Sequence, residues 1–303
     1  MAPVYQGAVL DSMFTARDPV YHKSLKSSVA QIFSMTNMKN FEVYADECTQ
    51  IFMEAMLTLE GQPVDFSMWL QWYAFDVIGA ITFQRRFGFT EQRRDVDDMI
   101  GKIDIGLQYV KIVGQLPFLI PLLQKGLMSR SFQRLNLLPD TFDRFMKVLI
   151  TAFAYSLAGS DTTAISLRAM IYYIVKNQHV YDKIQREIDE ADRNKQLSKF
   201  ITYEECLKLP QATMKEAMRL HPGVGFPLER FTPPEGAEIC GYRLPGQTNV
   251  SISAPVIHYI TDIYGEDADS FRPERWLEAS PEALKAMERY FLAVSNATQA
   301  LIT

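Results

Sequence analysis

One stretch constrains this chain more than any other, an apolar run from about Phe145 to Val175 that contains no proline. A run of that length is too long for a strand, and it predicts a helix of about thirty residues, roughly 45 Å long. Its middle, residues 158–163, reads AGSDTT. Glycine, aspartate and threonine are mediocre or poor helix formers, so a helix with a purely structural role would rarely carry them together. Such a local conflict is typical of a functional site.

The polar residues in this helix predict a specific local distortion. A glycine followed by serine and threonine hydroxyls, which compete for backbone carbonyls, favours a bent or opened turn with room for a water or a small ligand. Asp161 and Thr162 beside such an opening are candidates for a proton path. The alternative is a buried helix with a packing face rich in serine and threonine.

Composition and charge indicate a folded globular protein. Of the 303 residues, 48% are hydrophobic and 22% are charged, which is ordinary for a soluble domain with a sizeable core. The net charge of -5 comes without a sustained run of lysine or arginine. This argues against nucleic acid as a partner.

The three cysteines, Cys48, Cys206 and Cys240, lie far apart and form no C-x-x-C pair. Neither a disulfide framework nor a metal site is predicted, and a reducing, intracellular location fits best. No signal peptide and no apolar window long enough to span a membrane are visible. The segment from Ile112 to Leu123 (IVGQLPFLIPLL) contains two prolines. It could touch a membrane surface, line a substrate channel or form a buried loop.

Periodicity divides the chain into a mostly helical part, residues 1–225, and a small β region within residues 226–276. Residues 41–57 predict an amphipathic helix with Cys48 in the core. Asp65 or Ser67 can cap the helix that follows, and Asp76 inside it is interpreted as a buried acid with a partner. Between residues 226 and 256, alternation broken by proline and glycine turns predicts three or four short strands.

Two finer predictions concern the segment between the long helix and the strands. Lys183 and Glu187 stand four residues apart on a surface helix and predict a weak ion pair. Pro210 predicts two short helices, one ending at Leu209 and one beginning at Gln211, because proline interrupts a helix interior.

A candidate charge network links two separate segments. Glu216 and Arg219 stand three apart on a helix with apolar flanks, where a charge must be paired or cost several kcal/mol. Some way on, the sequence FRPERW (residues 271–276) offers Arg275. Glu216 bridged by both arginines would tie the helix to that loop.

Three motifs together, AGSDTT at 158–163, E-x-x-R at 216–219 followed by Leu-His-Pro, and FRPERW at 271–276, resemble the cytochrome P450 family in order and spacing. The sequences of residues 64–79 and 221–230 are most similar to those of fungal members of the pisatin demethylase-like group. The resemblance implies a mainly α fold with a small β region that holds haem. It also implies a monooxygenase that oxidises a small organic molecule with electrons from an NADPH-dependent reductase. Family members are often anchored in the endoplasmic reticulum membrane, and no anchor is visible in these residues.

Carried over residue by residue, the resemblance assigns several roles. Asp161 and Thr162 match the acid and the alcohol of the proton relay, and Ala158 and Gly159 match the residues that leave space over the iron. His22, Lys26 and Arg230 match residues that hold the haem propionates. Glu216, Arg219 and Arg275 match a structural triad.

The resemblance fails at the segment that supplies the haem-ligating cysteine. The sequence approaches it at residues 287–293 and then continues VSNATQALIT, with no cysteine after Cys240. Cys240 is interpreted as a small buried residue in a strand. We therefore expect a single, incomplete cytochrome P450 domain with a divergent tail at 277–303, inactive as written. Two alternatives stay open: a truncated or mis-spliced product, or a non-catalytic paralogue that acts as a binding or interaction protein.

Overall fold

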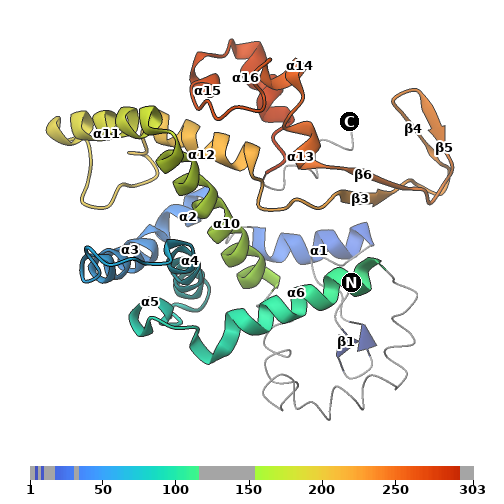
Figure 1. The fold of residues 1–303 in the computed structure, drawn as a ribbon. Helices are drawn as coiled ribbons and strands as arrows, with labels where there is room; N and C mark the ends of the chain where they lie inside the picture. The colour runs from blue at the N-terminus through green and yellow to red at the C-terminus, as the bar shows by residue number, and fades with distance from the viewer. Residues whose placement is uncertain (1–3, 6–7, 10–17, 31–33, 116–153, 294–303) are drawn as a thin grey trace. The chain divides into compact units, whose positions relative to one another are not determined.

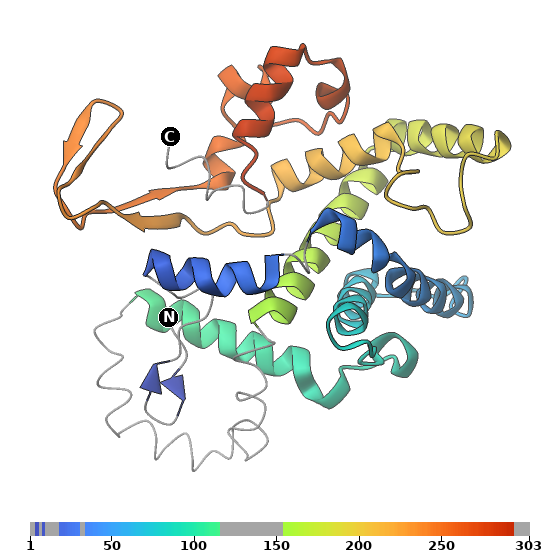
Figure 2. The ribbon, with the colours of Figure 1, turned by 180° about the vertical axis from the view of Figure 1, so that it is seen from behind.

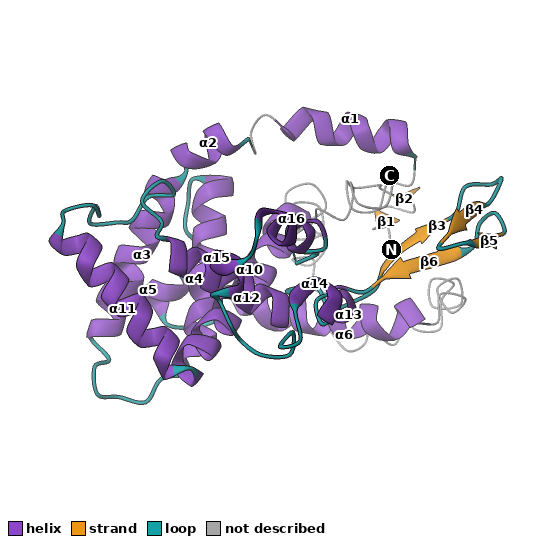
Figure 3. Ribbon diagram, turned by 90° about the horizontal axis from the view of Figure 1, so that it is seen from above, coloured by secondary structure: helices purple, strands orange, loops and turns teal. Residues whose placement is uncertain are grey.

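The computed structural model describes residues 4–5, 8–9, 18–30, 34–115 and 154–293. Among these residues helices predominate, and strands are confined to one segment near the N-terminus and to residues 228–252 (Figure 3). The mainly α fold with a small β region that the sequence predicts is confirmed. Contacts divide the chain into two compact units, residues 1–161 and 162–303.

The first unit contains most of the early helices. Helix α3 (Glu42–Leu57) packs against α4 (Phe66–Phe83), and the short α5 (Phe89–Gln92) packs against both (Figure 1). The predicted cap of α4 is confirmed, because Asp65 accepts a hydrogen bond from the backbone N–H of Met68. The other elements of this unit are β1 (Val4–Tyr5), β2 (Ala8–Val9), α1 (Pro19–Ala30), α2 (Met35–Asn40), η1 (Val96–Asp98) and α6 (Met99–Gln115).

Aromatic side chains fill the core of the first unit. Trp69 and Trp72 meet edge to face with ring centroids 5.1 Å apart, and Phe75 lies 5.4 Å from Phe89. Such pairs add to the free energy gained by burying their large apolar surfaces. Cys48 is buried, as the sequence predicts.

Helix α10 (Ala154–Lys176) spans the boundary between the units and is assigned without interruption through residues 158–163. The expected opened turn is therefore not seen as a break in the helix. Helix α11 (Gln178–Arg193) follows, and α12 (Lys208–Leu220) includes Pro210 in its first turn. The predicted division into two helices at this proline is wrong, because a proline in a first turn removes no hydrogen bond that the helix needs.

The strands of the second unit form two antiparallel ladders. Strand β3 (Leu228–Phe231) pairs with β6 (Asn249–Ile252), and β4 (Ala237–Ile239) pairs with β5 (Tyr242–Leu244) at the far end of the same arm (Figures 1 and 2). The prediction of three or four short strands in this part of the chain is confirmed. Helices α13 (Ala254–Ile257), α14 (Thr261–Tyr264), α15 (Arg275–Glu278) and α16 (Pro281–Arg289) complete the unit.

Cys240 does not lie in a strand and is not buried. It is exposed and, with Gly241, forms the two-residue turn between β4 and β5. Both residues have positive φ, 51° and 79°, as the tight turns favoured in hairpins require. The sequence interpretation failed because strand-like residues on both sides of the turn hid it.

Candidate functional site: a buried charge network and the polar turn of the long helix

The carboxylate of Glu216, on α12, is the centre of a buried hydrogen-bond network. Arg219 donates to it from Nε at 3.0 Å and from Nη2 at 2.9 Å. Arg275 Nε donates at 2.8 Å, Trp276 Nε1 at 2.9 Å and the backbone N–H of Arg272 at 3.1 Å. Glu216 and Arg219 are 0% exposed and Arg275 is 3% exposed. The predicted bridge between this acid and two arginines is therefore present in the structure.

The guanidinium of Arg219 is also used on its other side. Its Nη1 donates to the carbonyl oxygens of His258 and Ala268, both at 2.6 Å, and its Nη2 donates to Ser270 at 3.2 Å. One fork thus fixes the path of the loop between α13 and α15. Arginine suits this position because the five N–H donors of its planar guanidinium point in fixed directions.

Arg275 holds the same loop from its other end. It donates to the backbone carbonyls of Tyr264, Asp267 and Ser270, and its Nη1 lies 3.0 Å from Asp267 Oδ1. Burial alone would raise the pKa of Asp267, but the hydrogen bonds from Arg272 and Arg275 outweigh it, and the net result is a lowered pKa. Asp267 therefore stays ionised and adds a second acid to the network.

Sequence reasoning found three members of this network and missed Trp276, Asp267 and the carbonyl of His258. The indole was foreseeable in part, because Trp276 stands directly beside Arg275 and a buried indole N–H needs an acceptor. The carbonyl partners carry no side-chain signal. They become visible only when the loop between α13 and α15 is folded.

The polar turn of α10 places Asp161 against the neighbouring helix α4. Gln71 Nε2 donates to Asp161 Oδ1 at 3.4 Å. On the same side, a Cβ added to Gly159 would come within 3.2 Å of Ile78 Cδ1. The glycine therefore allows a close approach of α10 to α4 in the first unit, and Ile78 occupies the space beside it.

Thr162, the next residue, belongs to the second unit. Its carbonyl oxygen accepts a hydrogen bond from Ser166 Oγ at 2.9 Å, the back-bonding expected of serine within a helix. A Cβ at Gly223, which follows α12, would lie 3.3 Å from the same oxygen. The Leu-His-Pro-Gly turn thus packs directly on the backbone of this helix.

The remaining predicted residues lie on two other elements. His22 and Lys26 share α1, where the histidine is half-buried and the lysine exposed. Arg230 is exposed on β3, and its Nη1 donates to the carbonyl of Glu229 at 2.7 Å. Ala158 is in α10. The first two residues and Ala158 belong to the first unit, and Arg230 belongs to the second.

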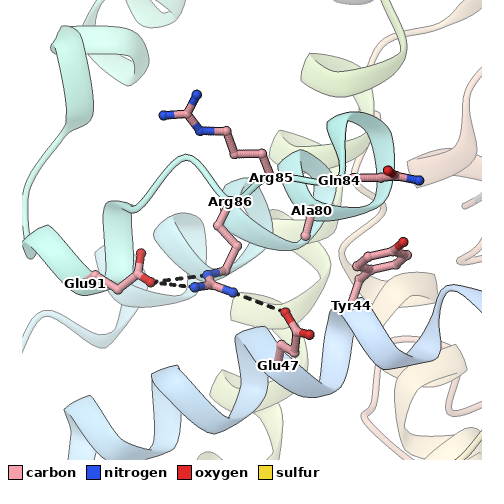
Figure 4. Close-up of a pocket in the computed structure, with 7 residues that line it drawn as sticks. All are labelled: Tyr44, Glu47, Ala80, Gln84, Arg85, Arg86 and Glu91. Atoms are coloured by element: carbon pink, nitrogen blue, oxygen red, sulfur yellow. Dashed lines mark hydrogen bonds and ion pairs between the residues drawn. The ribbon is translucent and has the colours of Figure 1, made fainter.

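A hollow of about 490 Å³ lies in the first unit, between α3 and the end of α4. Figure 4 draws the residues that line it. Arg86 crosses it and pairs with Glu47 at 3.2 Å and Glu91 at 2.9 Å, whereas Arg85 points away. Arg86, Glu47 and Glu91, three of the charged residues that line the hollow, are thus already paired with one another. Its lining is Tyr44, Glu47, Ala80, Gln84, Arg85, Arg86 and Glu91, which includes none of the predicted site residues.

The cytochrome P450 family profile matches residues 9–157 and 146–293, and the chain belongs to this family. It is 32% identical to a cytochrome P450 monooxygenase of Aspergillus terreus, over 95% of this chain and 68% of the relative. It is 32% identical to the monooxygenase cicH of Emericella nidulans (93% and 65%) and 31% identical to gsfF of Penicillium aethiopicum (88% and 62%). The chain thus spans roughly two thirds of the length of these fungal relatives.

The comparison also reveals residues that this chain lacks internally. The alignment with the Aspergillus terreus protein is 333 residues long, whereas the chain has 303 residues. Within the aligned stretch, the relative must therefore contain residues that have no counterpart here.

Membership of the family implies haem, and the cysteines of this chain do not fit its thiolate ligand. Burial, followed by the nearby charge of Asp76, raises the pKa of Cys48 to about 12, so this thiol stays protonated. Cys206 is half-buried, with its sulfur 4.0 Å from the Leu207 carbonyl, and Cys240 is exposed at the hairpin turn. None of the three follows the FRPERW segment, where the family places its ligand.

The predicted pair of Lys183 with Glu187 is wrong. Lys183 instead pairs with Glu274, and Glu187 accepts from the backbone N–H of Leu209, because tertiary partners compete successfully with a weak pair along the helix.

Of the possible membrane-contacting segment, residues 116–123 lie outside the described residues. In the part of the chain that is described, no helix combines the length and apolar character needed to cross a membrane.

Proposed function

We propose that this chain derives from a fungal haem-thiolate monooxygenase that oxidises a small organic molecule. We further propose that its 303 residues do not form the thiolate centre by themselves. The family match and the three fungal relatives support the first part. The second part rests on the three cysteines, of which one is buried and protonated and the others lie away from the expected ligand position.

In this proposal the residues named from the sequence have four roles. Glu216, Arg219 and Arg275 hold the helix and loop that shape the second unit. Asp161 and Thr162 belong to the proton path, with the carboxylate held by Gln71. Electrons would come from an NADPH-dependent reductase, the partner that the family uses. His22, Lys26 and Arg230 would meet the propionates of the cofactor, and Ala158 and Gly159 would line the space above it.

The experiment is the spectrum of the purified 303-residue protein, supplied with haem, reduced and exposed to carbon monoxide. We expect no red-shifted Soret band of thiolate ligation from a sample that circular dichroism shows to be folded and mainly helical. That outcome also favours a non-catalytic binding protein over an enzyme. A thiolate band with product formation would overturn the proposal.

Single cysteine variants sharpen the experiment. If a thiolate band does form, Cys206→Ser and Cys240→Ser identify its source, with Cys48→Ser as the buried comparison. In such an active preparation, Thr162→Ala should uncouple oxygen consumption from product formation, because the hydroxyl would no longer hold the water of the relay. Unchanged coupling would contradict the role of Thr162.

A further inference from the structure

His258, at the C-terminal end of α13, is a buried titratable group that the proposed function does not use. Its side chain is 0% exposed. Its ring stacks on Phe291 with centroids 5.6 Å apart and planes 17° apart, and it meets Tyr264 at 6.0 Å. A buried histidine must have partners for both ring nitrogens or lose stability.

Both nitrogens are satisfied by the backbone of two distant segments. Nε2 lies 2.9 Å from the backbone nitrogen of Leu292, and Nδ1 lies 2.8 Å from the carbonyl oxygen of Arg219. A backbone N–H can only donate, so Nε2 must accept and carries no proton. A carbonyl can only accept, so Nδ1 carries the proton. The two contacts therefore select one tautomer of the neutral ring.

We propose that His258 is a pH-sensitive clasp: its neutral imidazole ties the backbone at Leu292 to the end of α12, and protonation releases that tie. A second proton would sit on Nε2, where it would face the N–H of Leu292 at hydrogen-bond distance. Two donors cannot bond to each other, so the charged ring must leave this place or push Leu292 away. The residues after α16 would then lose their tether.

The charges around the ring oppose protonation on balance. Helix α12 presents Arg219 and Glu216, α14 presents the phenol of Tyr264, and the segment after α16 presents the uncharged ring of Phe291. The charge of Glu216 favours an imidazolium, but this carboxylate is already shared between two guanidiniums. Burial is the largest influence. The hydrogen bond to the Arg219 carbonyl favours the protonated ring, but burial together with the Arg219 charge outweighs it and lowers the pKa of His258 to about 4.

The test uses the full chain and two readouts by NMR between pH 7 and pH 3, a range that extends below the folded-state pKa of the ring. The first is the ¹⁵N chemical shift of the His258 ring, which reports its tautomer and its protonation. The second is the hydrogen-exchange protection of the Leu292 amide. We expect the Nδ1–H tautomer at pH 7 and a fall of about ten-fold in Leu292 protection as the ring protonates, the size of one net hydrogen bond.

An internal comparison separates the release of the clasp from unfolding. The amide of Leu284 donates to the carbonyl of Ser280 at the start of α16 and has no contact with His258. Its protection should persist while that of Leu292 falls. His258→Phe keeps a stacking ring without nitrogens and should leave Leu292 poorly protected at every pH, whereas His221→Phe, at an exposed histidine of the same unit, should behave like the wild type.

Two results would overturn the proposal. One is a ring that carries its proton on Nε2 at pH 7. The other is a ring that protonates without any change in Leu292 protection. If His258→Phe does not fold, the titration of the wild-type ring and of the two amides still decides between these outcomes.

Discussion

Among the described residues, each unit buries one acid in a helix, and the two acids are satisfied in different ways. In the first unit, Asp76 of α4 accepts three backbone N–H groups, from Gly88 at 2.7 Å, Phe89 at 3.2 Å and Thr90 at 2.9 Å. These donors belong to the start of α5, whose dipole also favours a negative charge. Glu216, in the second unit, instead accepts from the side chains of Arg219, Arg275 and Trp276, and from a single backbone N–H, that of Arg272.

The difference determines what each acid holds together. The partners of Asp76 lie 12 to 14 residues away in sequence, so this acid fixes a local corner between two helices. The partners of Glu216 include Arg275 and Trp276, 59 and 60 residues away. Loss of the first acid leaves neutral N–H groups without a partner, whereas loss of the second leaves buried positive charges.

The largest effect is therefore expected at Glu216. Glu216→Gln should destabilise the protein by about 3–5 kcal/mol, because the buried guanidiniums of Arg219 and Arg275 lose their counter-charge. Chemical unfolding at pH 7 measures this. Glu288→Gln is the matched control: Glu288 pairs with Lys215 on the surface and should contribute less than about 1 kcal/mol. Equal effects at the two positions would refute the buried network.

The next largest effect is expected from His258 and depends on pH. Its folded-state pKa of about 4 lies below the ordinary value of 6.5, so the unfolded chain binds the proton more readily. The stability contribution of the neutral ring is complete above pH 6.5. It falls by up to about 1.4 kcal/mol per pH unit as the pH drops toward 4. The difference in unfolding free energy between the wild type and His258→Phe, followed against pH, checks this slope.

A smaller effect is expected at Asp76. Asp76→Asn keeps one acceptor oxygen for the start of α5 but loses the charge and the second oxygen. A cost of about 1–3 kcal/mol follows, the range for leaving a buried donor unpaired. Asp65→Asn, at the start of α4, is the control and should be nearly neutral, since asparagine caps a helix as well as aspartate does. A cost at Asp76 above that at Glu216 would reverse the comparison.

The smallest effect concerns two cysteines, one in each unit. Cys48 is buried in the first unit, whereas Cys240 is exposed in the second. Cys240→Ser should change stability by less than about 0.5 kcal/mol, as expected for an exposed position. At pH 8, a thiol reagent should modify Cys240 readily, whereas Cys48, with its pKa raised to about 12, should react only after unfolding. Rapid modification of Cys48 in the folded protein would show that the core of the first unit opens.

Sequence reasoning succeeded where burial leaves few choices. An acid in a helix with apolar flanks needs partners, so the contacts of Glu216 with Arg219 and Arg275, and the buried, partnered state of Asp76, could be anticipated. The helices at 42–57 and 66–83 followed from periodicity and from the cap at Asp65.

The failures have a common physical origin in competing partners. Lys183 and Glu187 face each other on one helix, but each has a better partner in the folded unit. A proline such as Pro210 interrupts a helix when it falls in an interior turn but is tolerated in a first turn, and only the fold determines which of the two applies. The clasp at His258 uses two backbone groups, the carbonyl of Arg219 and the N–H of Leu292, and no pattern of side chains in the sequence predicts these contacts.

The hairpin turn at Cys240 and Gly241 has a consequence for the behaviour of the protein outside a reducing environment. A sulfur carried on the outermost loop of a two-stranded arm can meet its counterpart on a second molecule without any rearrangement of either core. Air oxidation would then join two copies end to end as a covalent dimer, and a reductant would separate them again with both folds intact.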